Sequence, residues 1–225
     1  MAARANPYFD IAMPAPKPAP PAPVNALAQL ERMHAEAVET ARLANLLGRS
    51  LHATIALATF GVLVVAAAGA GAAATMAWAI LIGGGVFAMA RVYRGAIAQP
   101  FERAALHAFA QDMNAFLLYA GFAWGAGAFL ALPQAIPSGG ALLFAAAPAA
   151  ALAALLRERQ PVLLFLAPVA ALTSLACVMR PFGDGALEAG LVLAACAIVA
   201  VPLQIVSRAG AKHGRAVLPR ALIAS

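Results

Sequence analysis

The chain has 225 residues, of which 64% are hydrophobic and 11% are charged, and its formal net charge is +6. A soluble domain of this size carries charge on about a quarter of its residues, so the composition excludes a water-soluble protein. It predicts an all-α, polytopic membrane protein whose positive charge flanks its membrane spans, and we expect membrane lipids rather than nucleic acid as its partners.

Residues 1–24 are predicted to form a flexible arm rich in proline and alanine. Its central run, PAPKPAPPAP at 14–23, lacks the N–H donors that a helix needs and favours extended polyproline II. Tyr8 and Phe9 lie in a short apolar patch ahead of this run, and we assign both to partner binding. The arm is either a docking peptide or a spacer.

Residues 25–50 are predicted to form an amphipathic cytoplasmic helix. Asn25 is suited to cap it, and apolar side chains recur at the spacings of one helix face. Charges of both signs argue against a helix that only binds lipid, because such helices are rich in Lys and Arg. We therefore predict packing on a partner protein or on a second copy. The residues assigned to this surface are Leu27, Leu30, Ala37 and Ala41.

Six apolar runs follow the amphipathic helix. A helix of about 20 residues crosses the roughly 30 Å of hydrocarbon, whereas a β-barrel needs short strands of alternating polarity. The predicted spans are 53–72, 75–92, 113–132, 140–156, 161–179 and 187–206. They form a six-helix transmembrane bundle over residues 51–207, which a basic cytoplasmic tail follows at 208–225.

The positive charges predict how the chain crosses the membrane. Of the 15 Lys and Arg residues, only Arg180 falls on the side opposite to all the others. Basic residues resist translocation, so both termini are predicted to be cytoplasmic. The abundance of alanine and arginine is typical of a GC-rich bacterial genome, and we expect the bacterial inner membrane.

Small residues inside the spans predict close packing between helices. In lipid such residues replace the hydrophobic drive, because they let two helix backbones approach. The glycines assigned to this role are Gly83, Gly84, Gly85, Gly121, Gly125 and Gly127. Pro148 and Pro168 lie mid-span in spans four and five, where each either kinks its helix or serves packing.

Groups that carry chemistry are scarce. No charged residue or histidine lies near the centre of a predicted span, where ion-coupled transporters usually place one. His52 and His107 are suited to ligate a haem iron, but the plainer interpretation is two polar residues at the membrane surface. No phosphate-binding loop or nucleophile motif occurs. We therefore predict a non-enzyme with no catalytic residue, metal or cofactor.

The two tryptophans are predicted to differ in role. Trp78 lies near the outer interface, where aromatic residues anchor spans. Trp124 lies near mid-membrane, and its indole N–H needs a partner there. It either packs inside the bundle or faces a ligand, and Asn114 is the second candidate for a ligand-facing residue.

Several of these features occur together in one known kind of module. Trp78 is followed by Arg91 in span two, and AGFAWG at 120–125 leads to Leu132–Pro133. With the prolines of spans four and five and the basic exit after span six, residues 50–215 resemble the six-span sensor modules of bacterial diguanylate cyclases and sensor kinases. The resemblance implies an input device that precedes a catalytic output domain. Because this sequence ends at Ser225, we expect the output domain in another chain.

The sequence therefore predicts a non-enzymatic sensory or regulatory module of the inner membrane that acts through a protein partner in the membrane or cytoplasm. One alternative is a structural or assembly subunit of a larger respiratory or photosynthetic complex, tethered by the arm. A second alternative is an uncoupled carrier for a small neutral solute.

Overall fold

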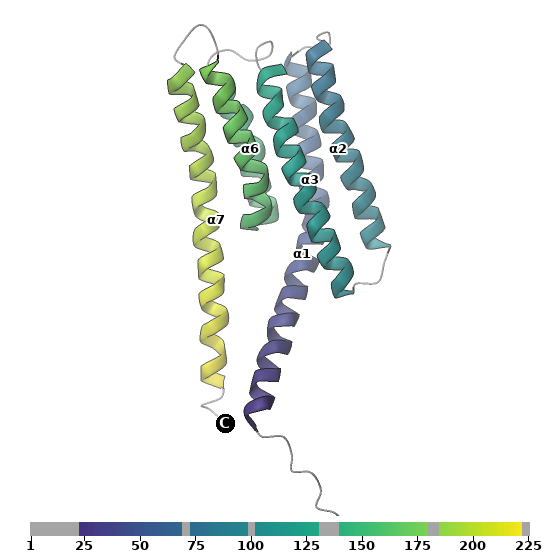
Figure 1. Ribbon diagram of the computed structural model, residues 1–225, viewed down its shortest axis with the longest axis vertical. Coiled ribbons are helices and arrows are strands. Elements are labelled where there is room, and N and C mark those ends of the chain that lie inside the picture. Colours follow the sequence, from purple (N-terminus) through teal and green to yellow (C-terminus); the bar gives the residue numbers. More distant parts are fainter. Residues whose placement is uncertain (1–22, 69–72, 99–101, 131–139, 180–184, 222–225) are drawn as a thin grey trace, which may run out of the picture. The chain divides into compact units, whose positions relative to one another are not determined.

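All regular structure in the described part of the chain is helical. The computed structural model describes residues 23–68, 73–98, 102–130, 140–179 and 185–221. The six helices in these ranges are α1 (Pro23–Ala68), α2 (Ala73–Ile97), α3 (Arg103–Leu130), α5 (Gly140–Leu156), α6 (Arg159–Val178) and α7 (Gly185–Ala221) (Figure 1). The predicted all-α fold class is confirmed. The chain divides into two units, Met1–Glu39 and Thr40–Ser225, which are described separately.

Five of these helices, α1, α2, α3, α6 and α7, are long and apolar enough to cross a membrane, which marks a multi-pass membrane protein. The apolar helix α5 has 17 residues, and its length of about 25 Å falls short of the roughly 30 Å of hydrocarbon. A sixth span at 140–156 therefore stays a prediction.

The helices break near the predicted positions but are longer than predicted. α1 ends at Ala68 and α2 begins at Ala73, on either side of the turn expected between the first two spans. α2 continues to Ile97 and α3 begins at Arg103, although both ends carry charged residues. Arg and Glu are good helix formers, so a helix continues readily beyond the hydrocarbon. For the same reason α1 shows no break at residue 50, and a separate N-terminal helix is not observed.

Within Thr40–Ser225, α3 lies between α2 and α6, and α6 also contacts α5 and α7 (Figure 1). Glycine explains how closely α3 and α6 approach. A Cβ atom at Gly121 would lie 2.5 Å from the Phe165 carbonyl oxygen, and one at Gly125 would lie 2.8 Å from Leu172 Cβ. Any larger residue would push the two backbones apart, so these glycines supply the close contact that lipid favours.

Pro148 and Pro168 are both buried inside their helices. The ring of Pro168 fills the space over Gly121, because a Cβ atom on that glycine would lie 2.6 Å from Pro168 Cγ. Pro168 therefore serves the packing of α6 on α3.

A turn of two residues joins α5 to α6. Arg157 has a φ of 54°, the left-handed conformation that commonly ends a helix, and its N–H donates to the Ala153 carbonyl at 3.1 Å. Glu158 is extended and immediately precedes α6. The turn therefore holds Glu158 in a defined position, where it pairs with Arg42 of α1.

Hydroxyl groups on α1 bond within their own helix. Ser50 Oγ donates to the Leu47 carbonyl at 2.7 Å, and Thr54 Oγ1 donates to the Ser50 carbonyl at 2.8 Å. Both side chains are buried, so these bonds let polar residues pack among apolar ones without a partner on another helix.

Candidate functional site

Four aromatic side chains, one each from α2, α3, α5 and α6, meet inside the bundle. The ring of Trp124 lies at their centre: its centroid is 5.4 Å from that of Trp78, 5.3 Å from that of Phe144 and 6.5 Å from that of Phe165. The Trp78 and Trp124 rings meet edge to face at 72°, while Trp124 and Phe144 are stacked at 29°. Both are favourable aromatic geometries, so the cluster joins four helices.

Both indole N–H groups of this cluster donate to backbone carbonyls of a neighbouring helix. Trp78 Nε1 lies 2.8 Å from the Ala123 oxygen, and Trp124 Nε1 lies 2.9 Å from the Phe144 oxygen. A helical carbonyl oxygen has two lone pairs and can accept this second bond. The two bonds therefore tie α2 to α3 and α3 to α5.

The predicted role of Trp78 as an interfacial anchor is wrong. Its side chain is 0% exposed, so it does not face the membrane surface. Gly127 makes the room for it: a Cβ atom on that glycine would lie 2.5 Å from Trp78 Nε1. The ring turns inward because this glycine leaves space on α3. In the sequence, only the presence of Gly127 indicated that α3 could accommodate a ring there.

The structure does not bring the two candidate ligand-facing residues together. Trp124 is 1% exposed, and the void that it lines with Phe116 has a volume of about 10 Å³, room for about one water molecule. Asn114 lies ten residues earlier on α3, about 15 Å along the axis. Its Oδ1 atom is buried and has no hydrogen-bond partner in the described chain.

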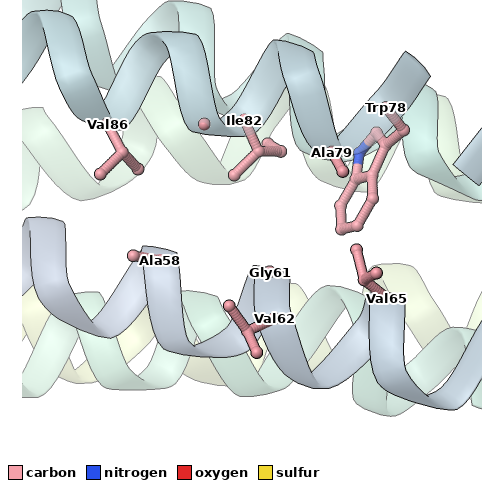
Figure 2. Close-up of a pocket in the computed structure, with 9 residues that line it drawn as sticks. Ala58, Gly61, Val62, Val65, Trp78, Ala79, Ile82 and Val86 are labelled. Carbon is pink, nitrogen blue, oxygen red and sulfur yellow. The ribbon is translucent and has the colours of Figure 1, made fainter. Parts of the chain in front are cut away.

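A larger space, which we call the Trp78 cleft, lies between α1 and α2 beside the aromatic cluster (Figure 2). Its volume is about 300 Å³. The lining residues are Ala58, Gly61, Val62 and Val65 of α1, and Trp78, Ala79, Ile82, Gly83 and Val86 of α2. The only polar side-chain atom among them, Trp78 Nε1, already donates to Ala123. The cleft therefore offers apolar contact and suits an apolar ligand.

Small residues shape this cleft. A Cβ atom at Gly61 would lie 3.3 Å from Ile82 Cγ2, so the two helices come close there. A Cβ atom at Gly83 or Gly84 would meet no atom within 4 Å. The predicted role of these last two glycines in close packing therefore does not hold for contacts within the described chain. They leave space open, whereas the neighbouring Gly85 is covered by the ring of Tyr119.

A second hollow, which we call the Asp112 groove, lies between α2 and α3 and has a volume of about 480 Å³. Its lining residues are Gly84, Gly85, Ala88, Met89 and Val92 of α2, and Asp112, Ala115, Phe116 and Tyr119 of α3. Asp112 is the only charged residue among them. The sequence placed Asp112 at the end of a span but did not indicate that Gly84 lies on the same groove.

The residues assigned to partner binding are only partly described. Tyr8 and Phe9 lie outside the described residues, as does the side chain of Leu27. Leu30 is 56% exposed, and Ala37 and Ala41 are exposed as well. The sequence reasoning missed two residues of this segment, Met33 and Val38, which are 52% and 56% exposed.

The remaining reactive groups do not form a site. Cys177 on α6 and Cys196 on α7 are buried and form no disulfide, and the described residues contain no cluster of metal-ligating side chains. The structure thus provides an aromatic cluster, two hollows and an exposed apolar stripe on α1, which consists of Leu30, Met33, Ala37 and Ala41. In comparisons with known proteins, no family model, curated protein or solved structure matches this chain.

Proposed function

We propose that the chain is a non-enzymatic regulatory module of the bacterial inner membrane that acts through a protein partner. The observation that carries the proposal is the exposure of apolar side chains on the N-terminal part of α1, where Leu30, Met33 and Val38 are each more than half exposed. The resemblance to sensor modules gives the direction: an input among the spans and an output outside them.

The exposed stripe favours a protein partner over lipid. Leu30, Met33, Ala37 and Ala41 recur at helical spacing along one side of α1, and full burial of one large apolar side chain contributes about 1.5–3 kcal/mol. The segment also carries Glu31, Arg32 and Glu36, and charges of both signs are costly inside hydrocarbon. Docking of the apolar face into a partner's groove buries the apolar side chains and leaves the charged ones in water.

The Trp78 cleft is the proposed input. Its α1 wall consists of Ala58, Gly61, Val62 and Val65, and Val62 is 67% exposed. If α1 can adopt two placements beside α2, an apolar molecule that binds one of them more tightly shifts the population toward that placement. Because the same helix carries the exposed stripe, occupancy of the cleft changes how the partner is bound.

The stripe also fits the second candidate, a structural subunit of a larger membrane complex. The two functions differ in one respect. A regulatory module changes its partner contact when the cleft is filled, whereas a structural subunit holds the contact constant.

A cross-linking experiment tests the proposal and separates these candidates. A photo-reactive amino acid replaces Leu30 or Met33 in the full chain in native membranes, and Ala35, on the other side of α1, is the control position. We expect one defined protein adduct from the stripe and none from Ala35.

The same adduct is then measured in a Gly83→Leu variant, whose added side chain fills the cleft. We expect its yield to change by about threefold or more, equivalent to roughly 0.7 kcal/mol. An unchanged yield supports the structural subunit instead. Equal adducts at all three positions, or none, contradict a partner surface on this stripe.

A further inference from the structure

We propose that the Asp112 groove binds a membrane lipid with an amine headgroup, phosphatidylethanolamine, with one acyl chain in the apolar part and the ammonium group at the Asp112 carboxylate. This inference concerns a different site from the Trp78 cleft and does not depend on the proposed function.

The groove is an open trough of apolar atoms. Gly84, Ala88 and Ala115 are small residues of its lining, and a Cβ atom at Gly84 would meet no atom within 4 Å. Tyr119 is held in place at one end of the groove. Its ring covers Gly85, and its hydroxyl donates to the Leu81 carbonyl at 2.9 Å. The trough is therefore held by the fold and does not depend on a bound molecule.

Exposed apolar side chains on α2 and α3 indicate that the trough faces the hydrocarbon of the membrane. Phe87, Leu118 and Phe122 lie on the same two helices and are 63%, 40% and 54% exposed. Both helices are long and apolar enough to cross a membrane, so side chains of this kind face lipid tails. If a methylene group fills about the volume of a liquid water molecule, roughly 30 Å³, the groove of about 480 Å³ accommodates most of one acyl chain.

Asp112 gives the groove a polar end. Tyr119 faces Gly85, and α2 and α3 run antiparallel. Asp112, seven residues before Tyr119, and Val92, seven residues after Gly85, therefore lie together about 10 Å away. The described residues provide no hydrogen bond or ion pair to the Asp112 carboxylate. This exposed carboxylate is therefore available to a cationic group at the end of the groove.

The charge of Asp112 selects among lipid headgroups. An anionic headgroup such as phosphatidylglycerol is repelled by it, and a choline group has no N–H to donate. An ethanolamine ammonium offers three N–H donors, as a lysine side chain does, and forms a charge-assisted hydrogen bond with a carboxylate.

Arg91 supplies the complementary charge for the lipid phosphate. It immediately precedes Val92 of the groove lining, and its guanidinium lies 6.0 Å from the ring centroid of Phe87. A guanidinium binds phosphate oxygens well. The groove thus has a carboxylate in its lining and an arginine one residue away from its lining, the two charges that a zwitterionic headgroup requires.

Native mass spectrometry of the full chain in detergent tests this proposal. The protein is mixed with equal amounts of phosphatidylethanolamine, phosphatidylcholine and phosphatidylglycerol that carry the same acyl chains. We expect the ethanolamine lipid to be retained about fivefold more than either of the others, which corresponds to roughly 1 kcal/mol. No preference, or a preference for the anionic lipid, overturns the proposal.

Two variants locate the site. Asp112→Asn should remove the headgroup preference, while Glu102→Gln, which removes a carboxylate from the start of α3 outside the groove, should retain it. Gly84→Leu should abolish retention of the lipid by filling the trough, whereas Gly83→Leu, which fills the Trp78 cleft, should not. Because Asp112 is exposed and Gly84 has open space, both variants should unfold at the wild-type temperature. Full preference in Asp112→Asn or full retention in Gly84→Leu contradicts the assignment.

Discussion

Arg42 and Glu158 lie 116 residues apart in the sequence and form an ion pair between α1 and the turn that joins α5 to α6. Arg42 Nε lies 2.7 Å and 2.8 Å from the two carboxylate oxygens, and the guanidinium Nη2 also bonds to Oε2. The Glu158 side chain is 16% exposed and that of Arg42 is 58% exposed. This pair connects α1 to a segment of the chain that is distant in sequence.

Loss of this pair should weaken the attachment of α1 only modestly. Glu158→Gln is expected to lower the free energy of unfolding by about 0.5–1 kcal/mol, because water screens the exposed guanidinium. Thermal unfolding in detergent measures the effect. The charge reversal Arg42→Glu should destabilise more, and the double variant Arg42→Glu/Glu158→Arg should recover stability. A double variant no more stable than Arg42→Glu would argue against the pair.

The two classes of glycine should respond in opposite ways to the same small substitution. Gly121→Ala places a Cβ atom 2.5 Å from the Phe165 carbonyl oxygen, and such overpacking destabilises by about 1–3 kcal/mol. Gly84→Ala meets no atom within 4 Å and should be neutral or stabilise by up to about 1 kcal/mol, because alanine favours the helix. Thermal unfolding of both variants in one detergent provides the comparison. Equal melting temperatures would show that α3 and α6 do not approach as described.

Tryptophan fluorescence should distinguish the two indoles, which are the only tryptophans of the chain. Trp78 lines the Trp78 cleft, while Trp124 lines the void of about 10 Å³. Both side chains are buried, at 0% and 1% exposed, so only a brominated tail that enters the Trp78 cleft comes close to an indole. In vesicles with brominated acyl chains, such a tail should quench the Trp124→Phe variant, which retains Trp78, more than Trp78→Phe. Adding Gly83→Leu to Trp124→Phe should reduce the quenching. Strong quenching of Trp124 would contradict its enclosed position.

The exposed stripe of α1 should be dispensable for folding but not for partner binding. Leu30→Glu/Met33→Glu is expected to weaken co-purification of the cross-linked partner about tenfold or more, equal to 1.4 kcal/mol. Its unfolding temperature should stay unchanged, because both side chains are more than half exposed. Ala35→Glu is the control for added charge. A matching loss in that control would mean that charge, rather than the stripe, determines binding.

The sequence predicted where successive spans are separated, although several helices extend beyond the predicted spans. The length limit of a span and the charged or glycine-rich breaks predicted separate helices ending near Ala68 and beginning near Gly140, and the structure has both ends. This succeeds because a membrane restricts how long an uncharged helix can be.

The rotation of each helix about its own axis was not predictable in the same way. In the run Gly83–Gly85, only Gly85 is covered by a neighbouring ring, and Trp78 turns inward although its depth suggested an anchor. Spans that are apolar on every face carry little periodic signal, so the side that meets protein depends on the shapes of its neighbours. The pairing of Arg42 with Glu158 is equally absent from the local sequence, because it depends on how distant helices meet.

The two indole bonds have a consequence for how this chain is made. Helices enter a membrane in the order of synthesis, so α2 and α3 can form the bond from Trp78 to Ala123 as a pair. The N–H group of Trp124 must wait for Phe144, which the ribosome adds twenty residues later. An unbonded donor in hydrocarbon is unfavourable by several kcal/mol. A nascent chain that stalls before α5 therefore leaves the Trp124 N–H group without the carbonyl that it bonds in the finished protein.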